Sequence, residues 1–166
     1  MKRRIVAFVC ALLLLGTLPA AALEGEATRA ADILTTLNLL DTFPDQDLDA
    51  PATRAQAAVL LVELAGAQSA AEHDLWISGF RDVPAWAETA VTYAAHQNWI
   101  SGVTVTTFRP DDPISADGWC TFLLRMLGYS DKEGDFTVNG AAVFAQHIGL
   151  ISRSYSGPLT QADLFE

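Results

Sequence analysis

The chain repeats one segment three times, and this repetition constrains its fold more than any other feature. Three segments align without gaps: AADILTTLNLLD (30–41), AVTYAAHQNWIS (90–101) and AAVFAQHIGLIS (141–152). Each begins with alanine, places apolar residues at helical spacing and closes on a large apolar residue. Two residues before the closing residue stand Asn38, Asn98 and Gly149, which tolerate the left-handed backbone common just after a helix. We therefore expect three helices that end in the same way.

A second helix is predicted after each of these segments. Its start is marked by Thr53, Ser115 or Thr160, all good N-cap residues that stand two positions after a proline. Thr53 with Gln56 also forms the T-x-x-Q pattern of a capping box. The predicted stops of the first two copies are Gly66 and Gly128. The predicted buried faces are Ala57, Leu60, Leu61 and Leu64 in the first copy, and Trp119, Phe122, Leu123, Met126 and Leu127 in the second.

These patterns predict an all-α fold of three helix–loop–helix repeats, at about residues 28–68, 78–130 and 135–166. The third repeat is truncated, because only QADLFE follows its N-cap. No segment alternates polar and apolar residues convincingly over the length of a strand. The 166 residues are enough for one domain with a real core.

The N-terminus has the pattern of a secretory signal peptide. A basic MKRR is followed by the apolar run 5–18, which is short for a membrane span, and by small residues at 20–22. We expect residues 1–22 to be removed, leaving a domain at 23–166 that does not insert into a membrane. An uncleaved N-terminal anchor is the alternative.

Removal of this segment makes the chain still more acidic. It takes away three of the ten basic residues and leaves seven Lys and Arg against 20 Asp and Glu, a formal charge of −13. This balance argues against nucleic acid and anionic membrane surfaces as partners. Only Cys120 then remains, so no disulfide can form within the chain. The fold must depend on its apolar core.

The second copy resembles the S-layer homology (SLH) repeat, a motif of the form F-x-D-V, W-A-x-x-A-V, an apolar-x-G turn, F-x-P-x-x-x-I and then T-R-A-E on a leucine-rich helix. The resemblance covers essentially all of 28–166. The first copy matches chiefly at its TRAQ helix and the third at AAVFAQHIGLIS and LTQAD. The matching residues of the second copy are Phe80, Asp82, Val83, Trp86, Ala87, Ala90, Val91, Ile100, Gly102, Phe108, Pro110, Ile114 and Ser115.

This resemblance implies both an architecture and a function. SLH domains usually pack three repeats as a pseudo-threefold helical bundle and anchor exported bacterial proteins to cell-wall polysaccharide. Their typical ligand carries ketal-linked pyruvate, hence a carboxylate, and its usual contacts are the T-R-A-E arginine and its neighbours in the grooves between repeats. The family thus implies a glycan site at Arg54.

The chemistry of Arg54 agrees with an anion site. It is expected at the first helical position, beside unpaired backbone N–H groups and the positive end of the helix dipole. A guanidinium binds a carboxylate through two hydrogen bonds, and a charge-assisted contact of this kind contributes about 1.5–3 kcal/mol. The alternative is that Arg54 only fixes its loop by bonding an acidic neighbour such as Asp47 or Asp49. The predicted glycan contacts are Thr53, Arg54, Gln56, Trp76, Ser115, Thr160 and Gln161.

The other two copies depart from the family motif. Ala116 and Gln161 occupy the arginine position, so only one groove keeps a cation. We therefore predict weak binding at roughly one site. Charges more than about 8 Å away are screened at physiological salt, so the overall negative charge does not forbid an anionic ligand.

The remaining reactive residues have structural interpretations. Asp45, Asp47 and Asp49 begin like a calcium loop, but Ala50 and Gln56 replace the glycine and glutamate it needs. The histidines have no metal spacing; His147 is expected on the buried side of its helix, and Cys120 as a half-buried structural thiol. The sequence contains no catalytic motif, so we expect no enzymatic activity, cofactor or metal.

The tryptophans divide by position. Trp86 and Trp119 are expected in the core, and Trp99 is expected to be structural. Trp76 lies in a linker, where it could stack on a sugar or pack between repeats.

The leading interpretation is a secreted, non-catalytic module of a bacterial cell surface that binds wall polysaccharide. One alternative is a degenerate scaffold for protein interaction that no longer binds glycan. Another is the targeting region of a larger exported hydrolase, with a passenger domain beyond residue 166.

Overall fold

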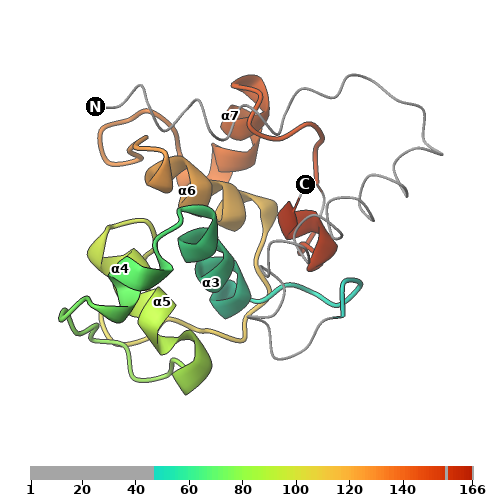
Figure 1. The fold of residues 1–166 in the computed structure, drawn as a ribbon. Helices are drawn as coiled ribbons and strands as arrows, with labels where there is room; N and C mark the ends of the chain where they lie inside the picture. The colour runs from blue at the N-terminus through green and yellow to red at the C-terminus, as the bar shows by residue number, and fades with distance from the viewer. Residues whose placement is uncertain (1–46, 156, 166) are drawn as a thin grey trace.

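A computed structural model describes residues 47–155 and 157–165, and this part of the chain is all-α, as predicted. Its elements are α3 (Arg54–Leu64), α4 (Gln68–Glu72), α5 (Ala85–His96), α6 (Ala116–Met126), the 3-10 turn η3 (Val138–Gly140), α7 (Ala141–His147) and the 3-10 turn η4 (Ala162–Phe165) (Figure 1). The predicted signal peptide (1–22) and the first repeated segment, with Asn38, lie outside the described residues.

The predicted helix ends are confirmed where the structure describes them. Asn98 has a φ of 62° and Gly149 a φ of 75°, each directly after the C-cap of its helix. In both cases the N–H of the following residue donates to a carbonyl of the last helical turn. Trp99 donates to the Ala94 carbonyl at 2.9 Å, and Leu150 donates to the Ala145 carbonyl at 2.8 Å. This is the Schellman arrangement, which satisfies otherwise unpaired carbonyls. The residue two positions before the closing apolar residue is therefore a helix stop, as expected.

Helix α3 lies at the centre of the described part of the molecule, with α5 and α6 packed against it (Figure 1). All nine residues from 55 to 63 are buried. The expected single buried stripe is wrong in two respects, because the helix is covered on nearly every side and because Leu64 is 44 % exposed. A short helix such as α3 with alanine, valine and leucine on all faces is suited to burial on every side.

The connections contain structure that the sequence patterns did not indicate. Helix α4 lies in the linker after α3, and η3 precedes α7.

Helix α6 contributes residues to two separate apolar clusters. Trp119 and Phe122 belong to the core around α3, whereas Cys120 and Leu124 join Phe136 and the buried alanines of α7. The expected α6 face thus describes only the side directed at α3.

Three short segments that precede helices are joined by a closed cycle of backbone hydrogen bonds. The Ala52 N–H donates to the Leu159 carbonyl at 2.8 Å, the Leu159 N–H to Ile114 at 2.9 Å, and the Ile114 N–H to Ala52 at 2.9 Å. All three residues are buried, at 0–2 % exposure. Buried backbone groups must be paired, and here each segment supplies one donor and accepts one bond. This cycle fixes the entry points of α3, α6 and η4 relative to one another.

The motif residues before and after α5 form one packed unit. The Phe80 and Phe108 rings lie 5.5 Å apart, and Pro110 is buried beside α3, whose Ala55 N–H it accepts at 3.0 Å. Gly102 is enclosed, because a Cβ there would lie 2.3 Å from Phe80 Cε1 and 2.5 Å from the Thr104 carbonyl oxygen. These residues therefore have structural roles.

The expectation that Trp86 lies in the core is wrong. Its side chain is 41 % exposed. Helix α5 buries Ala87, Val91 and Ala94, which follow one another at helical spacing. Trp86 precedes this series by one residue, about 100° around the helix, and so lies at the edge of the buried face.

Replacing Gly102 with alanine should destabilise the fold by about 1–3 kcal/mol, since the added methyl group overpacks a site with no free space. Chemical denaturation of the variant and the parent protein measures this difference. Val105→Ala in the same loop is the control, because Val105 is 87 % exposed and its truncation should change stability by less than about 0.5 kcal/mol. Equal stability of the two variants would contradict the packing described for Gly102.

Candidate functional site

The predicted N-caps Thr53 and Ser115 are present in the structure, and Thr160 makes a similar bond two residues before the 3-10 turn η4. Thr53 Oγ1 accepts from the Gln56 N–H at 3.2 Å and Gln56 Oε1 accepts from the Thr53 N–H at 2.9 Å, which completes the predicted capping box. Ser115 accepts from the Gly118 N–H at 3.2 Å. Thr160 Oγ1 accepts from the Asp163 N–H at 3.3 Å, and Asp163 Oδ2 accepts from the Thr160 N–H at 2.8 Å. The candidate residues Thr53, Gln56, Ser115 and Thr160 therefore act first as helix caps.

The expected anion site at the N-terminal amides of α3 is wrong. The Arg54 N–H donates to the Asp112 carbonyl and the Ala55 N–H to the Pro110 carbonyl, both at 3.0 Å. The next N–H, that of Gln56, is taken by Thr53. The loop before Ser115 thus supplies carbonyl oxygens where a ligand anion would have bound. Among the described residues at this helix end, only the guanidinium of Arg54 remains as an anion-binding group.

The guanidinium of Arg54 is held by neutral groups. Nε donates to the Phe108 carbonyl at 3.1 Å and Nη2 to the Ser101 carbonyl at 3.0 Å. The Cζ atom lies 4.7 Å from the centre of the Phe108 ring and 5.7 Å from that of Phe122, within the range of cation–π attraction. Two of its five N–H donors are used in this way, and the other three have no hydrogen-bond partner among the described residues.

The charge of Arg54 has no paired carboxylate among the described residues. The alternative of a bond to Asp47 or Asp49 is therefore wrong, since the side chain turns instead to the loop after α5. Burial lowers the pKa of Arg54, and the nearby charge of Asp112 opposes this shift. A half-buried cation held only by carbonyls and rings keeps electrostatic attraction for an anion.

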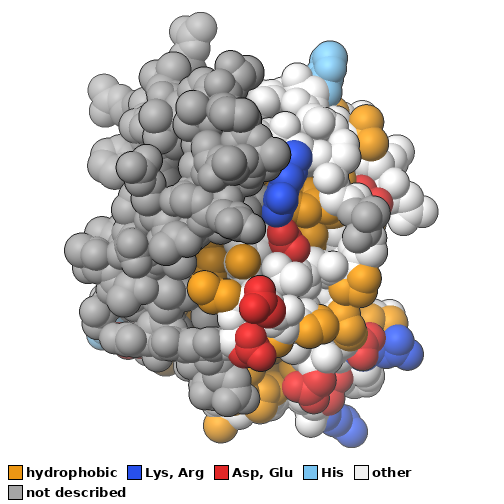
Figure 2. All heavy atoms as spheres, turned by 90° about the vertical axis from the view of Figure 1, so that its right-hand side faces the viewer, with side chains coloured by type: hydrophobic (Ala, Val, Ile, Leu, Met, Phe, Trp, Pro, Cys, Tyr) orange, Lys and Arg blue, Asp and Glu red, His pale blue; other side chains and the backbone are white. Residues whose placement is uncertain are grey.

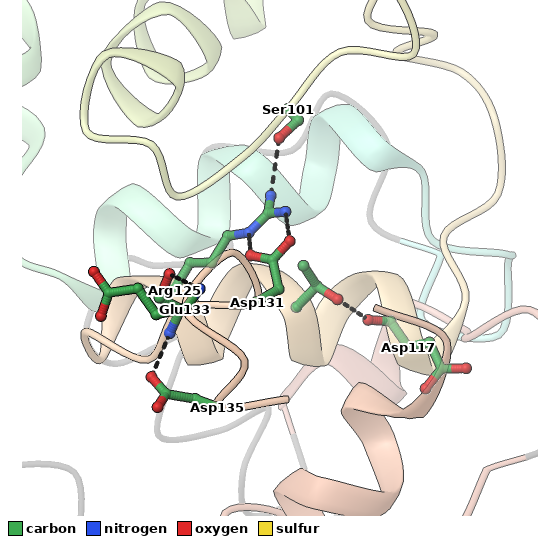
Figure 3. Close-up of polar contacts among 8 residues, drawn as sticks. Ser101, Asp117, Arg125, Asp131, Glu133 and Asp135 are labelled. Carbon is green, nitrogen blue, oxygen red and sulfur yellow. Dashed lines mark hydrogen bonds and ion pairs between the residues drawn. The ribbon is translucent and has the colours of Figure 1, made fainter. Parts of the chain in front are cut away.

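A second arginine fixes the residue that Arg54 contacts. Arg125 of α6 donates from Nη1 to Ser101 Oγ at 2.9 Å, while its Nε and Nη2 bind both oxygens of Asp131 at 2.8 Å (Figure 3). The hydrogen bond from Arg125 lowers the pKa of Asp131. Ser101 is thus held from two sides, through its side chain by Arg125 and through its carbonyl by Arg54. Sequence reasoning missed Arg125, because only the folded loop brings Ser101 to α6.

Asp82 fixes Phe108, whose carbonyl is the second one that Arg54 contacts. Its carboxylate accepts from the Phe108 N–H at 2.9 Å and from the Arg109 N–H at 2.8 Å. Burial acts to raise the pKa of Asp82, but these backbone bonds and the charge of Arg54 outweigh it, so the pKa lies below its ordinary value. Asp82 therefore positions the Phe108 carbonyl that Arg54 Nε contacts.

The structure brings three of the other predicted glycan contacts together. Antiparallel bridges pair Thr53 with Pro113, Ser115 with Pro158 and Thr160 with Pro51, so all three caps lie at the backbone cycle. Gln161 is 4 % exposed, and its Oε1 has no donor within the described residues. Trp76 stacks on His96, with ring centres 5.1 Å apart and planes 10° apart. His96 in turn contacts Asp74 at 2.7 Å, so Trp76 covers the end of α5 while staying 41 % exposed.

Two further expectations need correction. His147 is exposed, because α7 buries Ala141 and Ala145 and His147 lies on a different side. Cys120 is only 1 % exposed and hence fully buried, where a half-buried thiol was expected. Trp119 is buried and Trp99 packs edge-on against Tyr93 at 5.7 Å, so these two have the structural roles expected of them.

Two kinds of site are absent from the described ranges. No three His, Cys, Asp or Glu side chains gather there as a metal site requires. In the expected calcium loop, the Asp49 N–H donates to Asp47 Oδ1 at 3.2 Å. Asp45 lies outside the described residues. Of the helices between 47 and 165 that the structure describes, none has both the length and the hydrophobicity for crossing a membrane.

Comparisons of the chain with family models, with curated proteins and with solved structures found no match.

Replacing Asp82 with asparagine should destabilise the protein by about 1 kcal/mol at pH 7, which is less than a charge-assisted bond usually contributes because the carboxylate is exposed. Since the folded pKa lies below the unfolded value of about 3.9, the stabilisation is present above that value and is lost as the pH falls through the folded pKa. The difference between parent and variant in urea unfolding should therefore shrink towards zero on acidification from pH 6 to pH 2. A difference that grows on acidification would contradict this role.

Cys120 should resist alkylation in the native protein. Burial, with the charge of Asp117 as a smaller cause, raises the pKa of its thiol to about 12, so very little thiolate forms at pH 8. Mass spectrometry of the peptide that contains Cys120, after iodoacetamide treatment with and without urea, measures this. We expect modification only in urea; equal modification in both samples would show that the thiol is accessible.

Proposed function

We propose that this chain is a secreted, non-catalytic module of a bacterial cell surface, which binds cell-wall polysaccharide and so anchors a protein to the envelope. The proposal rests on the sequence resemblance to SLH repeats and on the signal-like N-terminus. Its strongest structural support is Arg54, a half-buried cation with three N–H groups to spare and no carboxylate partner among the described residues. A carboxylate-bearing sugar substituent has the chemistry to pair with it.

We further propose that the architecture is the pseudo-threefold bundle of three repeats. The cycle between Ala52, Ile114 and Leu159 supports this, because each residue directly precedes one of the three caps and each makes the same pair of bonds. The packing supports it too. Helix α3 packs on α5, and α6 packs on α7, so the second helix of one repeat meets the first helix of the next in both cases.

The overall charge does not prevent binding of an acidic glycan. Figure 2 shows acidic side chains over the described part of one face, with a few basic side chains among them. Attraction between exposed charges falls off over about 8 Å at physiological salt. A local contact at Arg54 can therefore dominate, although long-range repulsion should slow association.

A second candidate function is a scaffold for protein interaction that has lost glycan binding. One observation favours it: Arg54 already has structural partners in Phe108 and Ser101. In that case the arginine serves only to hold the loop after α5 against α3.

Retention on pyruvylated wall polysaccharide distinguishes the two functions. Arg54→Ala should weaken binding about ten- to hundred-fold, the loss expected for one charge-assisted contact. Arg54→Lys keeps the charge but not the planar donor pair, so it should weaken binding less than Arg54→Ala does. Arg109→Ala is the matched control, because the Arg109 side chain is 58 % exposed and its one polar contact among the described residues is with Asp112 at 3.4 Å. Thermal unfolding of each variant shows whether the fold is kept.

If Arg54→Ala remains folded and is retained as well as the parent protein, glycan binding at Arg54 is wrong and the scaffold function stands. If the parent protein itself is not retained, the anchoring function is wrong.

A further inference from the structure

A pocket of about 500 Å³ lies where the start of α6 meets α7 and the residues at 151–155 and 157–158. This volume is within the usual range of small-molecule sites, about 300–1,000 Å³. Arg54 does not line it, so it is separate from the site proposed above. Its apolar lining includes Val143 and Ile151, and its polar lining includes Ser115, Asp117 and Tyr155.

The pocket has a simple origin in the sequence. Ala116 is the first residue of α6, directly after its cap, as Arg54 is the first residue of α3. At α3 the long arginine side chain extends over Phe108 and Phe122. At α6 the alanine ends at Cβ, and Ala116 lines the pocket. Replacement of a large side chain by alanine at this position leaves open space.

The charge of the pocket is opposite to that at Arg54. Asp117 is the one charged residue among its described lining residues. Its Oδ1 accepts from the Ala142 N–H at 2.9 Å, which holds the carboxylate at the start of α7. The neighbouring Arg153 stacks on Tyr155 at 4.8 Å, but it pairs with Asp163 at 2.6 Å and does not line the pocket. A ligand carboxylate is therefore disfavoured here and a ligand cation is favoured.

The remaining polar lining suits a ligand rich in hydroxyl groups. Ser154 Oγ donates to Gln146 Oε1 at 3.0 Å, which orients the amide and leaves its NH₂ group as a donor. Asn139 adds a second amide and Tyr155 an aromatic ring to the lining. Amides, hydroxyls and one ring around an apolar floor can bind both the hydroxyl groups and the C–H face of a sugar.

We propose that this pocket binds a saccharide unit that carries a free, protonated amine, with the ammonium group paired to Asp117. The ligand class thus differs in charge from the acidic glycan proposed for Arg54, and the two sites act independently.

Titration calorimetry of the full mature chain with two matched probes tests this proposal. The probes are the β-1,4-linked tetramer of glucosamine, which carries free amines, and its fully N-acetylated counterpart, which is uncharged. We expect the amine tetramer to bind at least about ten-fold more tightly, by the size of one charge-assisted contact, and we expect this preference to weaken as salt is added.

Asp117→Asn is the decisive variant. Asparagine keeps an oxygen that can accept the Ala142 N–H, and the Thr121 hydroxyl bonds the backbone carbonyl of Asp117, which is unchanged. We expect about ten-fold or greater loss of affinity for the amine tetramer and little change for the acetylated one. Asp111→Asn, at an exposed position outside the pocket, removes the same charge and should leave both affinities unchanged.

Two further variants complete the test. Ala116→Arg should fill the pocket with a guanidinium and abolish binding of the amine tetramer. Arg54→Ala should leave that binding unchanged, so failure at one site does not imply failure at the other. The proposal is overturned if the parent protein does not bind the amine tetramer, if it binds both tetramers equally, or if Asp111→Asn weakens binding as much as Asp117→Asn.

Discussion

The cycle of backbone hydrogen bonds between Ala52, Ile114 and Leu159 is the constraint on which the rest of the described structure depends. Each residue lies directly before a helix cap, so the cycle sets where α3, α6 and η4 begin. The three N–H and three carbonyl groups are buried and satisfy one another, whereas unpaired they would cost free energy. The bond between Ala52 and Leu159 joins parts of the chain that are more than 100 residues apart. The cycle closes only when all three segments are present.

This constraint also decides the chemistry at the helix starts. By bringing the loop before Ser115 against α3, it places the Pro110 and Asp112 carbonyls on the first amides of that helix. The side chain at the first helical position then differs between the two helices. Arg54 extends over the Phe108 and Phe122 rings and presents a cation, whereas Ala116 lines a pocket beside the carboxylate of Asp117. The two helix starts therefore differ in the sign of their local charge.

Several parts of the fold and the candidate site could be predicted because they depend on neighbours in the sequence. The caps at Thr53, Ser115 and Thr160 and the stops at Asn98 and Gly149 follow from local backbone geometry. Residues whose exposure depends on distant partners were harder to place. Trp86 and His147 lie one or two positions away from the face that their helices bury, and helical spacing alone could not choose between adjacent faces. Arg125 gave no local signal, since its partner Ser101 lies 24 residues away.

The sequence by itself therefore determined the all-α class, the starts of α3 and α6, the ends of α5 and α7, and the presence of one arginine at a helix start. These properties follow from interactions over three or four residues. Only the tertiary structure decided that the amides of α3 are occupied, that α3 is buried on nearly all sides and that the pocket lies beside Ala116. The physical reason is that burial and hydrogen-bond satisfaction depend on which distant segments meet, and local patterns do not specify that meeting.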